Sequence, residues 1–444
     1  MEWKAPLYQA LIKHQTLNRS SFHTPGHKNN DSVFPPDLLN LDFTELPDTD
    51  SLYEASGPIL LAEKRAAELF GVKRSLISSG GCTLCIQAML RLAAPCGGKI
   101  VVGRMLHRSA VHTMALLGLE PVWVFPRTDK GADLPGRIHP EDIEKALQMA
   151  EDVRAVYLTS PDYFGVISDV PAISKICKKY GVPLLVDNAH GSHLRFVFPN
   201  LHPAHLGASM TACSAHKTLP VLTGGALLNI AEEKYVEEAK EAMALFGSTS
   251  PSYPIMASLD LACAWLEQKG EKAYQTLQQR ISYLKEEANR CGIAIPEGET
   301  DPIRLSLHTA SVGISGIQAA EHFRNCGVEP EYADGAFVVF LSTPFNSEKD
   351  FERLEHGIRT LPQGNALKIS HSLPIPPEIS CSLREAVLAP QEWVGLENAV
   401  GRIAGQAACP CPPGIPVVMP GEKIGSQAVE FLQKYGFLQV KVLK

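Results

Sequence analysis

The chain has 444 residues, of which 45% are hydrophobic and 20% are charged, and its formal net charge is −7 at pH 7. This composition is typical of a globular protein of two or three domains, and it provides no basic field that would attract nucleic acid or anionic lipid. No stretch approaches the roughly 18 to 20 apolar residues of a membrane span, so we expect a cytoplasmic protein with neither kind of partner.

The eleven cysteines are scattered along the chain. An odd number without a secretory leader favours reduced thiols over a disulfide framework. Cys82 with Cys85, and Cys409 with Cys411, lack a second cysteine or histidine pair at the spacing of a zinc site, so no metal is expected.

Apolar, strand-like runs alternate with helix-like segments between about residues 40 and 230. This alternation predicts an α/β fold with a mostly parallel sheet covered by helices. The expected strands are 75–78, 99–103, 121–125, 155–159, 183–187 and 210–214, and helical patterns follow at 84–92 and 109–117.

Two helical segments then form a long connector, and a smaller α+β domain follows from about residue 291. The expected connector helices are 255–269 and 271–290, and the small domain shows a strand, a helix and a strand at 303–306, 316–326 and 337–341. We therefore expect an N-terminal arm at 1–40, a large domain at 41–290, a small domain at 291–362 and a C-terminal domain at 363–444.

A glycine turn lies between the first expected strand and its helix, in the sequence Ser79-Gly80-Gly81-Cys82-Thr83. A turn of this kind at a helix start presents free backbone N–H groups and the positive end of the helix dipole to an anion. The turn is a candidate phosphate cup, although two glycines at a strand end also occur in a simple tight turn.

Polar side chains follow several other strand ends. His107 comes after 99–103 and is able to stack on a flat ring, while Thr159 and His190 are placed to hydrogen-bond such a ring. Each also fits an ordinary surface or core position. The carboxyl ends of parallel strands meet at one edge of a sheet, where ligands of open α/β folds bind, so their convergence favours a site.

Asp187 and Lys217 give this site its chemistry. Asp187 ends a buried apolar run, and a carboxylate there suits the protonated ring nitrogen of pyridoxal 5'-phosphate. Ala189 leaves room for the ring. Lys217, in Ser214-Ala215-His216-Lys217-Thr218-Leu219-Pro220, is the expected Schiff-base lysine.

Nearly the whole chain resembles the Orn/Lys/Arg decarboxylase family in its short form, without the extra N-terminal wing of the longest relatives. The resemblance rests on the motifs Phe22-His23-Thr24-Pro25-Gly26-His27-Lys28, Leu41-Asp42-Phe43-Thr44-Glu45-Leu46, His107-Arg108-Ser109, Asp187-Asn188-Ala189-His190-Gly191, the lysine segment 214–220, Thr249-Ser250-Pro251-Ser252-Tyr253-Pro254, Pro412-Pro413-Gly414-Ile415-Pro416 and Pro420-Gly421-Glu422.

The resemblance implies an aspartate-aminotransferase-like (fold type I) large domain that binds pyridoxal phosphate. It implies that Lys217 holds the cofactor covalently, that Asp187 pairs with the pyridine nitrogen and that His107 stacks on the ring. Ser214 and His216 would lie beside the phosphate and the lysine.

It also implies a homodimer or higher homo-oligomer with shared active sites, in which Thr249 reaches the neighbouring subunit's phosphate. Glu331 occupies the position of an acidic residue that faces the substrate's basic end, and a carboxylate suits an ammonium or guanidinium group.

The chain departs from the family at the phosphate cup, where Gly80-Gly81-Cys82 replaces glycine followed by two hydroxyl residues. With fewer hydroxyl donors, we expect weaker cofactor binding than in the relatives. Asn188 and Asp162 replace the usual glutamate and threonine.

These observations predict decarboxylation of arginine, lysine or ornithine to agmatine or a diamine, as in polyamine biosynthesis. His216 and Lys217 are candidate proton donors to Cα. One alternative is an aminotransferase or β-eliminating lyase, for which Arg304 is the candidate carboxylate clamp in the small domain. Another alternative is a non-catalytic regulatory relative.

Overall fold

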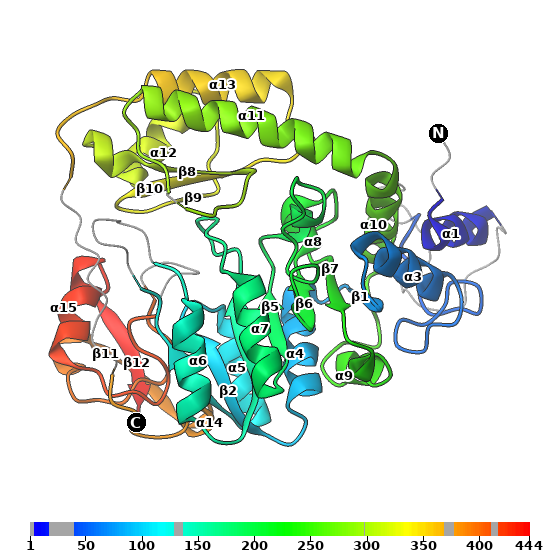
Figure 1. The fold of residues 1–444 in the computed structure, drawn as a ribbon, viewed down its shortest axis with the longest axis horizontal. Helices are drawn as coiled ribbons and strands as arrows, with labels where there is room; N and C mark the ends of the chain where they lie inside the picture. The colour runs from blue at the N-terminus through cyan, green and yellow to red at the C-terminus, as the bar shows by residue number, and fades with distance from the viewer. Residues whose placement is uncertain (1–3, 17–39, 128–135, 297, 368–376, 410–415) are drawn as a thin grey trace, which may run out of the picture. The chain divides into compact units, whose positions relative to one another are not determined.

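A computed structural model describes residues 4–16, 40–127, 136–296, 298–367, 377–409 and 416–444 (Figure 1). The motif at 22–28 and most of the motif at 412–416 lie outside the described residues. The chain forms two compact units, Met1–Ala93 with Leu185–Gln275, and Ala94–Leu184 with Thr276–Lys444. Each is described by itself.

The strands of the first unit are neighbours in the order β1, β7, β6, β5, with bounds Arg74–Ser78, Ala226–Ile230, Met210–Cys213 and Leu184–Asp187. Strands β5 and β6 are parallel, whereas β7 runs antiparallel to β1 and β6. Every residue of β5, β6 and β7 is buried, as their continuous apolar runs require.

Helices cover this part of the sheet. They are α1 (Pro6–Thr16), α3 (Pro58–Phe70), α4 (Gly81–Ala93), α8 (Ala215–Thr218), α9 (Ala239–Ala244) and α10 (Tyr253–Trp265), with 3-10 turns at Ser192–Arg195 and Glu233–Tyr235 and a π-helical turn at Leu266–Gly270. The expected helix 255–269 is thus α10 followed by the π-helical turn.

In the second unit the strands β4 (Val153–Thr159), β2 (Gly98–Gly103) and β3 (Leu119–Val124) are neighbours in that order, and β2 is parallel to both others. The helices next to them in sequence are α5 (Arg108–Leu117), α6 (Pro140–Met149) and α7 (Val170–Tyr180). All six expected strands are confirmed, with ends that differ by no more than two residues.

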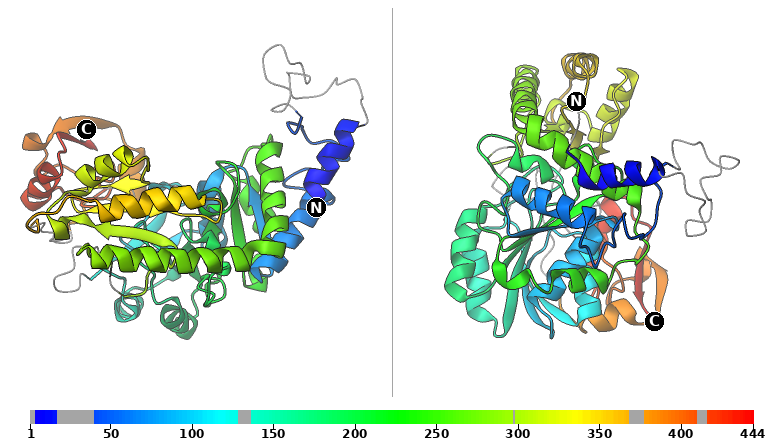
Figure 2. Two further views of the ribbon diagram at one scale, coloured as in Figure 1. Left: turned by 90° about the horizontal axis from the view of Figure 1, so that it is seen from above. Right: turned by 90° about the vertical axis from the view of Figure 1, so that its right-hand side faces the viewer.

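A three-stranded antiparallel sheet follows, with the order β8 (Arg304–His308), β10 (Phe337–Leu341), β9 (Tyr332–Ala333). Its helices are α11 (Glu271–Arg290), α12 (Gly316–Asn325) and α13 (Glu348–Arg359), with a 3-10 turn at Thr309–Val312. Figure 2 shows α13 running alongside α11, where Tyr283 donates to Glu355 at 2.7 Å. The expected strand, helix and strand of this region are confirmed.

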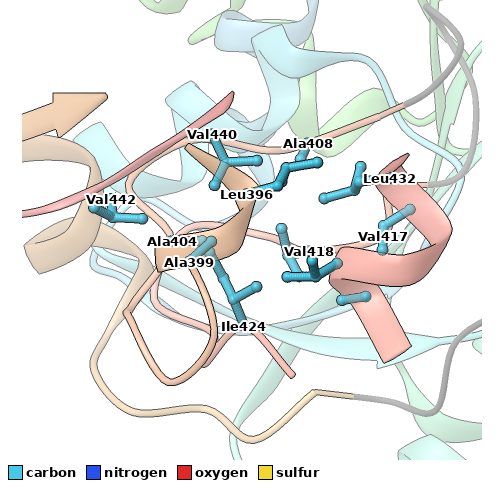
Figure 3. Packing of buried hydrophobic residues seen from close by; sticks show 12 residues of the cluster. Leu396, Ala399, Ala404, Ala408, Val417, Val418, Ile424, Leu432, Val440 and Val442 are labelled. Atoms are coloured by element: carbon cyan, nitrogen blue, oxygen red, sulfur yellow. The ribbon is translucent and has the colours of Figure 1, made fainter. Parts of the chain in front are cut away.

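The C-terminal segment has its own apolar core (Figure 3). Its elements are α14 (Leu383–Leu388), β11 (Gln391–Gly395), a 3-10 turn at Leu396–Asn398, α15 (Ser426–Lys434) and β12 (Gln439–Leu443), and β11 and β12 pair antiparallel. Leu396, Val418, Ile424, Leu432 and Val440 are each at most 4% exposed and pack together.

Local sequence signals explain several helix ends. Helices α12, α13 and α14 begin with capping boxes in which Ser315, Ser347 and Ser382 exchange hydrogen bonds with the residue three positions on. Gly118 and Gly181 end α5 and α7 in the left-handed conformation that glycine adopts without strain. No helix in the described ranges is long and apolar enough to cross a bilayer.

Candidate active site

Lys217 and His190 meet in the first unit. Lys217 lies in the short helix α8, directly after β6, and His190 lies just past the end of β5. The Nζ of Lys217 is 3.0 Å from Nε2 of His190, whose side chain is buried. An ammonium has only donors, so Lys217 donates to Nε2 when it is charged, and the proton of a neutral His190 ring is then on Nδ1.

Asp187, the last residue of β5, has a carboxylate that is 1% exposed. Its Oδ1 accepts a hydrogen bond from Ala189 N at 3.1 Å, and the Sγ of Cys82 lies 4.0 Å from the same oxygen. Burial raises the pKa of the Cys82 thiol, and the neighbouring Asp187 raises it further. Cys82 is therefore a protonated thiol that points a weak donor at Asp187.

The glycine turn at the start of α4 adjoins this carboxylate through Cys82. Ser78 Oγ accepts from Gly80 N at 3.2 Å and donates to Gly81 O at 3.0 Å, which closes the turn. Gly81 has φ +69°, and a Cβ built there would meet nothing within 4 Å. The turn therefore opens onto free space at the N-terminus of α4.

Ser214 completes this cluster, because its side chain forms a hydrogen bond with the Cys82 thiol. This bond lowers the pKa of the thiol and so opposes the effects of burial and of Asp187. Ser214 is 3% exposed and is the N-cap residue of α8, three residues before Lys217. The structure therefore brings five expected site regions together in the first unit: Gly80 to Thr83, Asp187, Ala189 with His190, Ser214, and Lys217.

His216 and Thr249 belong to the same unit but have other surroundings. His216 Nδ1 is 3.1 Å from the carbonyl oxygen of Gly225, which also accepts from the backbone N of His216. The ring is thus held against the turn after α8. Thr249 is exposed on the segment between α9 and α10.

His107 and Thr159 lie at the ends of neighbouring strands of the second unit. His107 is the N-cap residue of α5, and its Nδ1 accepts from Ser109 N at 3.2 Å. Its ring is exposed. Thr159 ends β4, and its Oγ1 is buried without a hydrogen-bond partner among the described residues. Such an oxygen is suited to bind a ligand atom.

Glu331 is exposed and follows Pro330, just before β9. The hydroxyl of Tyr163 donates to Glu331 Oε1 at 2.8 Å, and the Tyr163 ring packs edge-on against Tyr332. Sequence reasoning did not single out Tyr163, because a lone tyrosine in a loop after a strand carries no distinguishing signal.

Arg304 is engaged within the second unit. It is 2% exposed, its Nη1 donates to the carbonyl oxygen of Tyr163 at 2.8 Å, and its Nη2 lies 3.7 Å from the carboxylate of Asp301. These contacts do not favour Arg304 as the clamp for a substrate carboxylate.

The fold of the chain is similar to those of two solved enzymes. The lysine decarboxylase LdcF of Francisella novicida matches with a TM-score of 0.85 and 18% identity over 99% of this chain and 81% of that one. An aspartate aminotransferase of Thermus thermophilus matches with a TM-score of 0.55 and 15% identity over 68% and 88%. The expected aspartate-aminotransferase-like fold is confirmed.

Sequence comparison then gives the family. Residues 5–300 match the model of the Orn/Lys/Arg decarboxylase major domain, and residues 373–440 match that of its C-terminal domain. The chain belongs to the Orn/Lys/Arg decarboxylase family. The expectation of an amino-acid decarboxylase is thereby confirmed at the level of the family.

Two curated relatives cover almost the whole chain. The uncharacterized protein YaaO of Bacillus subtilis (strain 168) is 33% identical over 97% of this chain and 94% of its own length. The arginine decarboxylase of Bacillus anthracis is 28% identical over 98% and 93%.

Proposed function

We propose that the protein uses pyridoxal 5'-phosphate to remove the carboxyl group of a basic L-amino acid, giving agmatine or a diamine and carbon dioxide. The observation that carries the proposal is the cluster in the first unit, where a half-buried lysine amine, a buried carboxylate and an open glycine turn at a helix start occur together. Family membership supports the same reading.

The donor set fits the cofactor. Lys217 would hold it covalently, Asp187 would face its pyridine nitrogen, and the turn from Gly80 to Thr83 with Ser214 would bind its phosphate. His107 would stack on the ring and Thr159 would hydrogen-bond it. When bound, the cofactor supplies an electron sink for the bond that is broken at Cα.

The chain's own residues supply binding and proton handling. Asp187, buried and hydrogen-bonded by Ala189 N, would supply the negative charge that favours a protonated ring nitrogen opposite it. His190 Nε2 lies 3.0 Å from Lys217 Nζ and is placed to accept the proton that the Lys217 ammonium must lose before its amine can react. His216 and Lys217 remain the candidate donors of the proton that returns to Cα.

The substrate's basic end would pair with Glu331, whose orientation is held by Tyr163. A carboxylate attracts an ammonium or a guanidinium in a charge-assisted hydrogen bond. Because the relatives of higher identity include arginine decarboxylases, arginine is the first substrate to test.

We propose in addition that the protein works as a homodimer, with Thr249 of one subunit at the phosphate of the other. The exposed position of Thr249 leaves it accessible to a second copy. Light scattering during gel filtration measures the mass of the assembly, and a monomer with full activity would refute shared sites.

The test of the function is product analysis with arginine, lysine and ornithine in the presence of pyridoxal phosphate. Carbon dioxide and the matching amine in equal amounts are expected from one of them. A keto acid or ammonia would identify an aminotransferase or lyase instead. No product from a chain that lacks the cofactor's absorption band would identify a regulatory relative.

A further inference from the structure

Arg104 forms a buried contact between the end of β2 and the C-terminal segment, within the second unit. Its side chain is fully buried, its Nη1 and Nη2 donate to Oε1 and Oε2 of Glu422 at 2.5 and 2.7 Å, and its Nε donates to Pro416 O at 3.3 Å. Such a bidentate ion pair fixes both the distance between the two side chains and their relative orientation.

Neighbouring groups hold each member of this pair in place. The guanidinium of Arg104 lies 5.1 Å from the ring centroids of both Trp123 and Phe125, within cation–π range. Met419 N donates to Glu422 Oε2 at 2.6 Å. Neither side chain is free to turn away without leaving a buried charge unpaired.

Arg104 is only three residues before His107, the N-cap residue of α5. The segment from Arg104 to His107 is the whole connection between β2 and α5. An anchor at Arg104 therefore limits where the His107 ring can lie.

The same C-terminal segment also contacts the other end of α5. Arg384, on α14, donates to the carbonyl oxygens of Ala115 and Leu116 at 3.3 and 2.7 Å. These are terminal carbonyls of a helix, where a cation is favoured by the helix dipole. The connection that precedes α5 and the C-terminal end of α5 thus each have a charged partner between residues 377 and 444.

We propose that the C-terminal segment positions His107 by holding Arg104 before α5 and the C-terminal end of α5, with Glu422 and Arg384 as positioning residues. The inference rests on the proposed function, because it assigns to His107 the stacking on the cofactor ring. Glu422 and Arg384 would touch neither cofactor nor substrate and would act through α5.

The test is a double-mutant cycle on the affinity for pyridoxal phosphate, measured by absorbance titration of the full chain. Glu422→Gln keeps the shape of the side chain but removes its charge. We expect it to raise the Kd about 2- to 30-fold, the range of indirect coupling effects. In a His107→Ala background, the same change should alter the Kd by less than about twofold.

Equal losses in the two backgrounds would overturn the proposal, because a general loss of stability does not depend on His107. Arg384→Gln, at an exposed position, gives a milder second test with the same expected dependence on His107, and it serves if Glu422→Gln does not fold. Glu392→Gln is the matched control, since it removes an exposed ion pair with Arg402 in the same segment and should leave the Kd unchanged.

Hydrogen exchange over residues 104–118 separates this proposal from the proposed function. Faster exchange in Glu422→Gln than in Glu392→Gln is expected whether or not the cofactor binds. Unchanged exchange would overturn the anchoring of α5. A wild-type chain without the cofactor's absorption band would instead refute the proposed function and the role given to His107.

Discussion

At the scale of single residues, the unusual sequence of the proposed phosphate cup has a structural explanation. Gly81 has φ +69°, a conformation in which a side chain is strained, and Cys82 turns inward to Asp187 and Ser214. A glycine at position 81 therefore adopts this turn without backbone strain, at the cost of the hydroxyl group that a serine or threonine would provide. The thiol of Cys82 lies 4.0 Å from Oδ1 of Asp187.

Gly81→Ser tests the expectation of weakened cofactor binding, and Gly81→Ala is its matched control. Both variants carry the same left-handed strain of about 1 kcal/mol, so their difference isolates the hydroxyl. One added hydrogen bond to a charged phosphate should make the serine variant bind pyridoxal phosphate about tenfold more tightly than the alanine variant. Equal dissociation constants in titration would show that the hydroxyl reaches no phosphate.

Asp162, which replaces a threonine of the family, makes stability depend on pH. Burial raises the pKa of its carboxyl to about 6, although hydrogen bonds from backbone N–H groups and the charge of Arg304 oppose this. Because the folded-state pKa lies above the ordinary 3.8, the folded protein gains stability from the protonated group at low pH and loses it as pH rises through about 6.

Asp162→Asn should remove this dependence while keeping an oxygen for Val166 N, which donates to Asp162 Oδ1 at 2.8 Å. Relative to the wild type, the free energy of unfolding of the variant should rise by about 1 to 2 kcal/mol between pH 5 and pH 8. Urea denaturation at both pH values measures it. A difference between the two proteins that does not change with pH would contradict the raised pKa.

At the scale of elements, the strands were predictable because each is a short apolar run bounded by turn residues. The sequence analysis missed strand β7, and periodicity does not reveal that this strand runs antiparallel to β1 and β6. The strand ends correctly indicated where Asp187 and Lys217 lie. The contact of Arg104 with Glu422 was not predictable, because the two residues are 318 positions apart in the sequence.

A buried carboxylate accepts hydrogen bonds from the first turn of helix α1. Asp260 Oδ2 on α10 accepts from Leu7 N and Tyr8 N at 2.8 and 3.2 Å, and its Oδ1 lies 3.7 Å from Arg65. These amides belong to the first turn of α1, which has no partner for them within the helix. Asp260 therefore ties α1 to α10.

Asp260→Ala should lower the free energy of unfolding by about 1–3 kcal/mol, because it leaves buried N–H groups without an acceptor. The control is Glu267→Ala, which removes the exposed partner of the same Arg65 and should cost less than about 0.5 kcal/mol. Urea denaturation compares the two variants. Losses of equal size would show that Asp260 does not anchor α1.

At the scale of the whole molecule, the chain combines an aspartate-aminotransferase-like fold with a C-terminal segment that matches the model of the Orn/Lys/Arg decarboxylase C-terminal domain. That segment has its own core and contacts the rest of the second unit through Glu422 and Arg384. The family could be predicted from the sequence because several of its motifs in the described residues, such as 187–191 and 214–220, lie at strand ends, where chemistry requires particular residues. The substrate could not be predicted, because the depth of the substrate pocket depends on long-range packing that no local motif encodes.

The proposed function depends above all on Lys217 as the residue that holds pyridoxal phosphate. Its test is the release of labelled carbon dioxide from carboxyl-labelled arginine, lysine and ornithine by the wild type and by Lys217→Ala, each saturated with the cofactor. We expect release from one amino acid by the wild type and a loss of several orders of magnitude in the variant. Similar rates in the two proteins, or no release from any of the three amino acids by the wild type, would contradict this function.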